Sequence, residues 1–111
     1  MLVSRSSPFG GRTRTLVLLA LSLLEESYAR ELARLMEVSL NGVQQALRGL
    51  EVDGLVAARS SGRTRLYRLN PRYFARRELE SYLKRLAGAE TELVERTASL
   101  RRRPRRTGKP R

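Results

Sequence analysis

The chain contains no cysteine, no histidine and no tryptophan, and aromatic residues make up only 5% of its 111 residues. Without cysteine and histidine, the sequence cannot supply a disulfide framework, a Cys/His zinc site, a thiol nucleophile or a histidine general base. It also carries no phosphate-binding glycine motif and no other recognisable catalytic constellation. We therefore expect no catalytic site, no bound metal and no cofactor, and we expect a protein that is not an enzyme.

A long hydrophobic run is also absent. The most apolar segment, residues 16–24, is far shorter than the ~20 residues that a membrane-spanning helix requires. Three arginines precede this segment, as in a secretory signal, but Glu25 and Glu26 follow it directly and no small-residue cleavage site is present. We expect a buried helix at this position, no membrane partner, and a cytoplasmic, nucleoid-associated protein.

Acidic residues are few relative to basic ones. The chain has 23 Lys and Arg against 11 Asp and Glu, which gives a formal net charge of +12. Residues 101–111, RRRPRRTGKPR, are rich in arginine and contain no acid. Such a surplus predicts a polyanionic partner such as nucleic acid. The like charges and prolines of this tail predict a disordered segment that adds sequence-independent contacts.

The pattern of apolar residues predicts a mainly α fold with a small β-hairpin. We expect a flexible N-terminal arm at residues 1–11, one folded domain at 12–87, a C-terminal helical extension at 88–100 and the basic tail at 101–111. The elements expected inside these limits are helices at Arg12–Leu24, 28–36, Leu40–Val52 and 71–86, and strands at 55–59 and Thr64–Leu69.

Local signals mark several element ends. Ser27 and Ser39 are predicted N-caps of the second and third helices, and Asn70-Pro71 is expected to start the fourth. Phe74 is assigned to the apolar stripe of that helix, and the sequence leaves open whether Gly88 ends it.

Residues 27–70 combine a helix, a tight turn, a second helix and a hairpin that carries arginines. This order is typical of small proteins that place a helix in the DNA major groove and a basic loop on the flanking backbone. Asn and Gln side chains match the N6/N7 edge of adenine, and Arg matches the O6/N7 edge of guanine. The residues expected to contact DNA are Ser39, Asn41, Gln44, Gln45 and Arg48 on the helix, and Arg59, Arg63 and Arg65 on the hairpin. For each residue alone, an ordinary solvated position is the alternative.

The first helix is apolar on nearly every side, which indicates burial on more than one face. In a small domain this favours a homodimer. The candidate interface residues are Leu18, Leu19 and Leu23 on the first helix and Tyr82, Leu83 and Leu86 on the fourth. Packing within the chain's own core is the alternative for the same residues.

Residues 31–56, ELARLMEVSLNGVQQALRGLEVDGLV, and the return strand RLYRLN at 65–70 resemble winged helix-turn-helix regulators of the ArsR/MarR-like type from bacteria and archaea. Three shorter motifs, FGGRTR at 9–14, YARELARL at 28–35 and VQQAL at 43–47, are similar to winged-helix proteins found beside or fused to small nucleotidyltransferases. No transferase domain is present in this sequence, so that activity is not carried over.

The resemblance implies a winged helix-turn-helix with an added C-terminal helix. It implies major-groove contact through Asn41, Gln44, Gln45 and Arg48, wing contact through Arg63 and Arg65, and dimerisation through the first and last helices. The sequence departs from metal-sensing members because it lacks Cys and His, so metal-regulated release is not expected.

The function that these observations favour is a sequence-specific, double-stranded DNA-binding regulator of prokaryotic transcription, acting as a dimeric repressor. Two alternatives stay open at this point. One is a protein-interaction module that partners a nucleotidyltransferase in the manner of an antitoxin. The other is a non-specific coating protein for nucleic acid, in which the arginine tail dominates binding.

Overall fold

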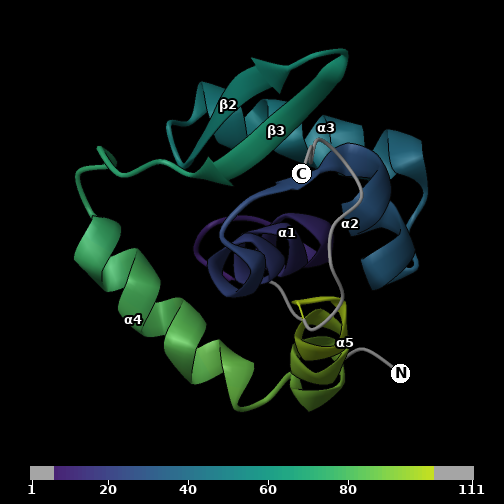
Figure 1. Ribbon diagram of the computed structural model, residues 1–111. Helices are drawn as coiled ribbons and strands as arrows, with labels where there is room; N and C mark the ends of the chain where they lie inside the picture. Colours follow the sequence, from purple (N-terminus) through teal and green to yellow (C-terminus); the bar gives the residue numbers. More distant parts are fainter. Residues whose placement is uncertain (1–6, 102–111) are drawn as a thin grey trace.

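The computed structural model describes residues 7–101 (Figure 1). In chain order the elements are α1 (Arg12–Leu24), β1 (Ser27–Tyr28), α2 (Ala29–Met36), α3 (Leu40–Val52), β2 (Val56–Ser61), β3 (Thr64–Leu69), α4 (Arg76–Ala87) and α5 (Thr91–Arg101). The first six residues of the expected N-terminal arm, and the basic tail beyond Arg101, lie outside the described residues. The prediction of a mainly α fold with a small hairpin is confirmed.

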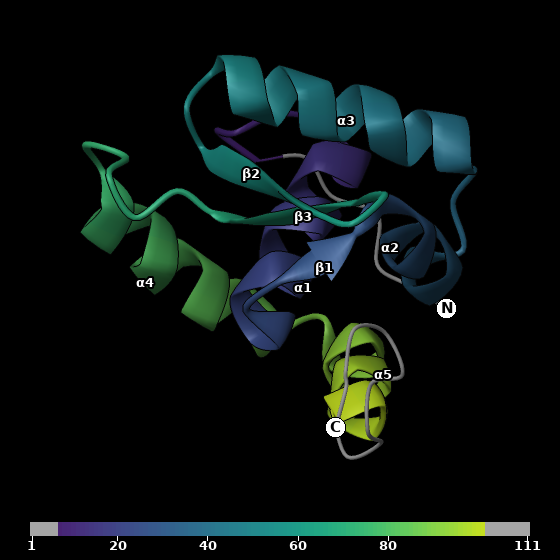
Figure 2. The same ribbon diagram turned by 45° about the horizontal axis from the view of Figure 1, so that its top comes forward.

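Helix α1 lies in the middle of the molecule, and the other elements surround it (Figures 1 and 2). It packs against α3 on one side and against α4, α5 and β3 on others. Every residue from Leu16 to Leu21 is at most 2% exposed. The apolar character of this helix on nearly every side is therefore explained by contacts within one chain.

This burial bears directly on the expected dimer surface. Leu18 and Leu19 are fully buried, and Leu83 and Leu86 on α4 are 1% and 7% exposed. These four side chains have almost no surface left to offer a second copy. Leu23 and Tyr82 are only partly buried, so they are the two candidates that keep accessible area.

The sheet has three antiparallel strands in the order β1-β3-β2. Strands β2 and β3 pair from Val56 opposite Leu69 to Ser61 opposite Thr64, which leaves Gly62 and Arg63 as a two-residue turn. Gly62 has φ +63°, a value that such tight hairpin turns require and that glycine adopts without strain. The turn is shorter than the sequence predicted, because β2 continues to Ser61 rather than ending at Arg59.

The sequence did not predict strand β1, and the assignment of Ser27 as a helix N-cap is wrong. Ser27 pairs with Tyr67 of β3 and is buried, and its hydroxyl donates a hydrogen bond to Oε1 of Glu31. The N-cap of α2 is Tyr28, which makes no side-chain capping bond. The capping signal of a serine before a helix is local, so it does not reveal that the backbone of Ser27 pairs with a distant strand.

Helices α2 and α3 are joined by a tight turn. Glu37 adopts the left-handed conformation with φ 58°, and its backbone N–H is bonded to carbonyls of the last turn of α2. Ser39 then caps α3 as predicted, because its Oγ accepts a hydrogen bond from the Gly42 N–H at 3.0 Å. Both ends of the turn are thus fixed by local hydrogen bonds.

Helix α4 begins later than the sequence predicted, at Arg76 instead of residue 71. Asn70 donates a hydrogen bond from Nδ2 to the Gly54 carbonyl, and its Oδ1 accepts one from the Arg72 N–H. Asn70 therefore builds a turn against the end of α3 rather than capping a helix. Phe74 falls in this loop and is 91% exposed, so its assignment to the core is wrong.

Gly88 ends α4, which the sequence had left open, and α5 follows as a separate helix. Arg96 fastens α5 to the helix-turn-helix: its Nη1 donates to the Leu35 carbonyl at 2.7 Å, and its Nη2 pairs with Glu37 at 3.1 Å. Within residues 7–101, no helix combines the length and apolarity needed to cross a bilayer.

Candidate nucleic-acid interface

Helix α3 has one buried face and one solvent face. Val43, Ala46, Leu47 and Leu50 point into the core and are at most 7% exposed. The four polar side chains expected to read DNA bases all lie on the opposite, exposed face: Asn41, Gln44, Gln45 and Arg48. The helical period brings these residues together on one side, so the structure gathers this part of the predicted site.

The hairpin of β2 and β3 lies beside α3 (Figures 1 and 2). A shallow surface groove joins the two elements, and its lining includes Gln44 from α3 together with Arg63 and Arg65 from the hairpin. Residues predicted from separate parts of the sequence thus share one surface. Arg63 lies at the tip of the turn and is exposed.

Arg30 of α2 lines the same groove and is exposed. Arg30 is not among the residues that the sequence led us to expect in contact with DNA. Its position on the first helix of the helix-turn-helix, which in such units crosses the DNA backbone, was the signal that could have identified it.

Several solved structures resemble this chain, among them the following three proteins. HlyU from Vibrio cholerae in its reduced form is 28% identical, with a TM-score of 0.56 over 69% of this chain and 75% of that chain. A point mutant of ZitR from Lactococcus lactis is 18% identical, with a TM-score of 0.55 over 92% of this chain and 81% of that chain. A protein described as a "possible transcriptional regulator for arsenical resistance" is 31% identical, with a TM-score of 0.46 over 68% and 95% of the two chains.

HlyU and ZitR are winged-helix transcriptional regulators. The chain is a winged helix-turn-helix protein. The resemblance inferred from its sequence motifs is confirmed at this level, and the hairpin of β2 and β3 is its wing. No protein-family model matches the sequence, and no curated protein matches it.

The arginine at the middle of the wing is held by an acidic partner. Arg59 donates from Nε and Nη2 to the two carboxylate oxygens of Glu26, at 2.9 and 3.0 Å. These hydrogen bonds raise the pKa of Arg59 above its already high ordinary value. Arg59 does not line the groove beside Gln44. For the expected contact with DNA, Arg59 would have to break its hydrogen bonds to Glu26 or keep them while it also contacts a phosphate.

Arg65 joins the wing to α3. Its Nη2 donates to Oε2 of Glu51 at 2.8 Å, and its guanidinium lies 5.8 Å from the centre of the Tyr67 ring. The negative charge of Glu51 raises the pKa of Arg65. The pair fixes the wing relative to the helix, but it also places a carboxylate at the surface where a phosphate would bind.

We expect Glu51→Gln to strengthen DNA binding by roughly threefold to tenfold, because Arg65 no longer has to break an ion pair with Glu51 before it contacts a phosphate. The slope of log K against log salt should become steeper by about one unit per chain, which is about two units for the expected dimer, because each Arg65 gains a phosphate contact. Fluorescence anisotropy with a labelled duplex across a salt series measures both quantities.

Glu95→Gln is the matched control, since it removes the same charge from exposed α5, at the end of the molecule away from the wing (Figure 1). An equal gain in both variants would assign the effect to net charge. Unchanged or weaker binding by Glu51→Gln alone would show that the ion pair serves the interface by holding the wing in place.

The FGGRTR motif has a structural role next to α3. Arg14 donates from Nε to the Phe9 carbonyl at 2.9 Å and from Nη2 to Asp53 at 2.7 Å. Its guanidinium crosses Gly49, where an added Cβ would lie 2.6 Å from Nη1. Glycine at position 49, which is unfavourable in a helix, therefore gives Arg14 room to connect the N-terminal turn to the end of α3.

Proposed function

We propose that this winged-helix protein binds double-stranded DNA and regulates transcription. The observation that carries the proposal is the single surface formed by the exposed face of α3 and the arginines of the wing. An α-helix fits the major groove, and the adjacent wing then lies along the flanking phosphates or the minor groove. The winged-helix regulators that the chain resembles in structure support this use of the fold.

The side chains on α3 have the chemistry for reading bases. Gln44, Gln45 and Asn41 each offer a paired donor and acceptor for adenine, and Arg48 offers two donors for guanine. Arg30, Arg63 and Arg65 surround this set with positive charge, which suits phosphates rather than base edges. We propose that α3 sets the sequence preference and that the arginines supply most of the affinity.

We further propose that the protein acts as a dimer and represses by occupying a promoter. A two-fold pair would place two α3 helices in successive major grooves about 34 Å apart, on a pseudo-palindromic site. Among the interface candidates from the sequence, Leu23 and Tyr82 keep exposed surface for such a contact. We propose that each of these two residues contributes to the dimer contact.

The deciding experiment selects a randomised duplex library with the purified protein at moderate salt. We expect an inverted-repeat motif to be enriched. The double variant Gln44→Ala/Arg48→Ala should lose this motif and bind the selected site about 100-fold or more weakly, since each base contact contributes about 1–3 kcal/mol.

Ser81→Ala/Arg85→Ala is the matched control, because it removes one polar group and one cation from exposed positions on α4. It should retain the motif. Binding without any motif, unchanged by substitution on α3, would contradict sequence-specific recognition and would favour a protein that coats nucleic acid through its arginines.

A further inference from the structure

The loop between β3 and α4 exposes a large apolar side chain. Phe74 is 91% exposed there, although a phenylalanine side chain gains free energy when it is buried. The loop projects from one side of the molecule, at the end of β3 away from the tip of the wing (Figures 1 and 2). It therefore forms a surface separate from the groove that contains Gln44 and Arg63.

Hydrogen bonds support the loop behind this exposed ring. The Arg72 N–H donates to Oδ1 of Asn70, and the Tyr73 N–H donates to the Asn70 carbonyl. The Arg76 N–H donates to the Tyr73 carbonyl. The centre of the Tyr73 ring lies 5.0 Å from that of Phe74, and Tyr73 is itself packed against the core. Because the exposed ring is already supported, a partner that covers it would restrict few further degrees of freedom.

Positive charge surrounds the exposed ring. Arg72 and Arg77 are exposed, and within residues 7–101 neither forms an ion pair with a carboxylate. Arg76 is exposed as well and lies 3.6 Å from Glu80. The only acid in the sequence from 70 to 79 is Glu78. The surface around the ring thus has an excess of positive charge and two cations available to a partner.

We refer to Phe74, Arg72 and Arg77 together as the Phe74 patch. Aromatic residues and arginine are enriched at protein interfaces, whereas lysine is depleted. Residues 70–79 contain two aromatic residues, three arginines and no lysine. A second copy of this chain would bring like charges together at the patch, and duplex DNA would have to unstack a base step before it could cover the ring. The patch therefore favours a protein partner of opposite charge.

We propose that the Phe74 patch binds an acidic amphipathic segment of another protein, in which Asp or Glu alternates with large apolar residues. An apolar side chain of the segment packs on the Phe74 ring, and neighbouring carboxylates contact the guanidinium groups of Arg72 and Arg77. Arginine suits this role because its planar fork can bind both oxygens of one carboxylate. This binding requires neither DNA nor a role in transcription, so it stands apart from the proposed function.

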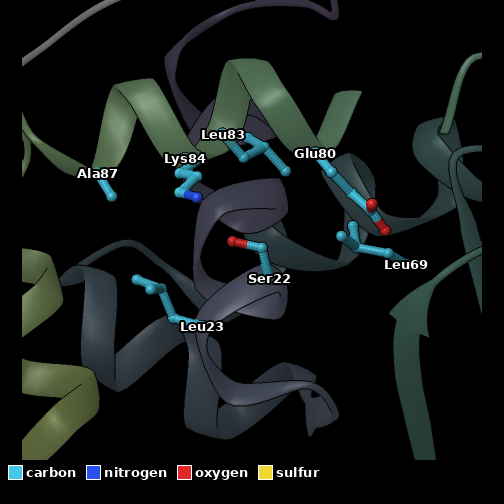
Figure 3. Close-up of a pocket in the computed structure, with 7 residues that line it drawn as sticks. All are labelled: Ser22, Leu23, Leu69, Glu80, Leu83, Lys84 and Ala87. Atoms are coloured by element: carbon cyan, nitrogen blue, oxygen red, sulfur yellow. The ribbon is translucent and has the colours of Figure 1, made fainter. Parts of the chain in front are cut away.

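The patch is also separate from the two surfaces proposed above. The groove beside α3 contains Gln44 and Arg63. Leu23, one residue of the proposed dimer contact, borders a hollow between α1 and α4 that Ser22 and Lys84 also line (Figure 3). The Phe74 patch shares no residue with the groove or with this hollow, so its occupant does not replace DNA or a second copy on the same side chains.

The test pans a library of random peptides displayed on phage against the full-length protein at moderate salt, with Phe74→Ser in the counter-selection. We expect the enriched peptides to combine Asp or Glu with Leu, Phe or Trp. Fluorescence anisotropy should show that Phe74→Ser binds these peptides about tenfold or more weakly, because it truncates the central aromatic contact. The thermal unfolding midpoint of Phe74→Ser should match that of the parent, because the ring lies in solvent.

Two further comparisons test the charge and the location. Arg72→Gln/Arg77→Gln should weaken peptide binding by about tenfold or more and remove most of its salt dependence. Arg34→Gln/Arg85→Gln removes the same charge from exposed positions outside the patch and should bind as the parent does. Val52→Ser removes a side chain that is 85% exposed but lies between two acidic residues, so it should also leave peptide binding unchanged.

Three results would overturn the proposal. The first is enrichment of no peptide, or of peptides without acidic residues, or an equal loss of binding in the patch variants and their controls. Displacement of the peptide by an oligothymidylate that Phe74→Ser no longer binds would assign the patch to single-stranded nucleic acid instead. Self-association of the parent that Phe74→Ser weakens in analytical ultracentrifugation would assign the patch to a second copy.

Discussion

Raising the salt concentration from 50 to 200 mM is expected to weaken DNA binding by about 10⁴-fold or more. Each chain of the proposed dimer should make ~4–6 phosphate contacts, and each contact releases condensed counterions when it forms. The resulting slope of log K against log salt is roughly −7 to −11 for the dimer. The exposed arginines of α2 and the wing, Arg30, Arg63 and Arg65, are expected to provide the first of these contacts.

Anisotropy titrations of one duplex at several salt concentrations give this slope directly. Arg63→Ala should make it shallower by about two units in the dimer, one for each wing. Arg85→Ala on α4 removes the same charge outside the proposed DNA surface and should leave the slope nearly unchanged. A slope near zero would contradict a phosphate-binding interface. It would favour the alternative that this protein is a protein-interaction module.

Leu18→Ala is expected to lower the free energy of unfolding by about 2–5 kcal/mol, at any protein concentration. Leu18 is fully buried at the centre of the chain, so the substitution removes buried methyl groups and leaves a cavity that the surrounding helices cannot easily fill. Denaturant unfolding followed by circular dichroism, at two protein concentrations, measures the change.

Leu23→Ser tests a partly exposed position near the C-terminal end of the same helix. Leu23 is partly exposed, so the substitution should reduce the unfolding free energy much less while weakening the proposed dimer, as seen by analytical ultracentrifugation. If Leu18→Ala instead dissociated the dimer and left the monomer's stability intact, the placement of Leu18 in the core of one chain would be wrong.

The two helices of the helix-turn-helix illustrate what could be predicted locally. Helix α3 has the bounds that its sequence pattern indicated, because an N-cap serine and an apolar period both act within a few residues of one another. The same period placed Asn41, Gln44, Gln45 and Arg48 on one exposed face. The chemistry of that face was therefore available before the fold was known.

The wing illustrates what local sequence patterns could not predict. Its hairpin was expected, but the partners of its arginines were not, because Glu26 and Glu51 belong to other elements. Charge counts along a sequence treat every arginine as available to DNA. Only the folded arrangement shows that Arg59 and Arg65 each have a carboxylate in place, and that Arg30 joins Arg63 beside Gln44.

The sequence by itself determined the class of fold, the helix-turn-helix, the wing and the polar face of α3, because these depend on periodicity, capping and turn residues that act over short distances. Tertiary structure alone decided which apolar faces are internal, that Ser27 joins a strand opposite Tyr67, and that Phe74 lies in solvent. These outcomes depend on which distant segments meet, and apolar composition alone does not distinguish a face covered by the same chain from one that awaits a partner.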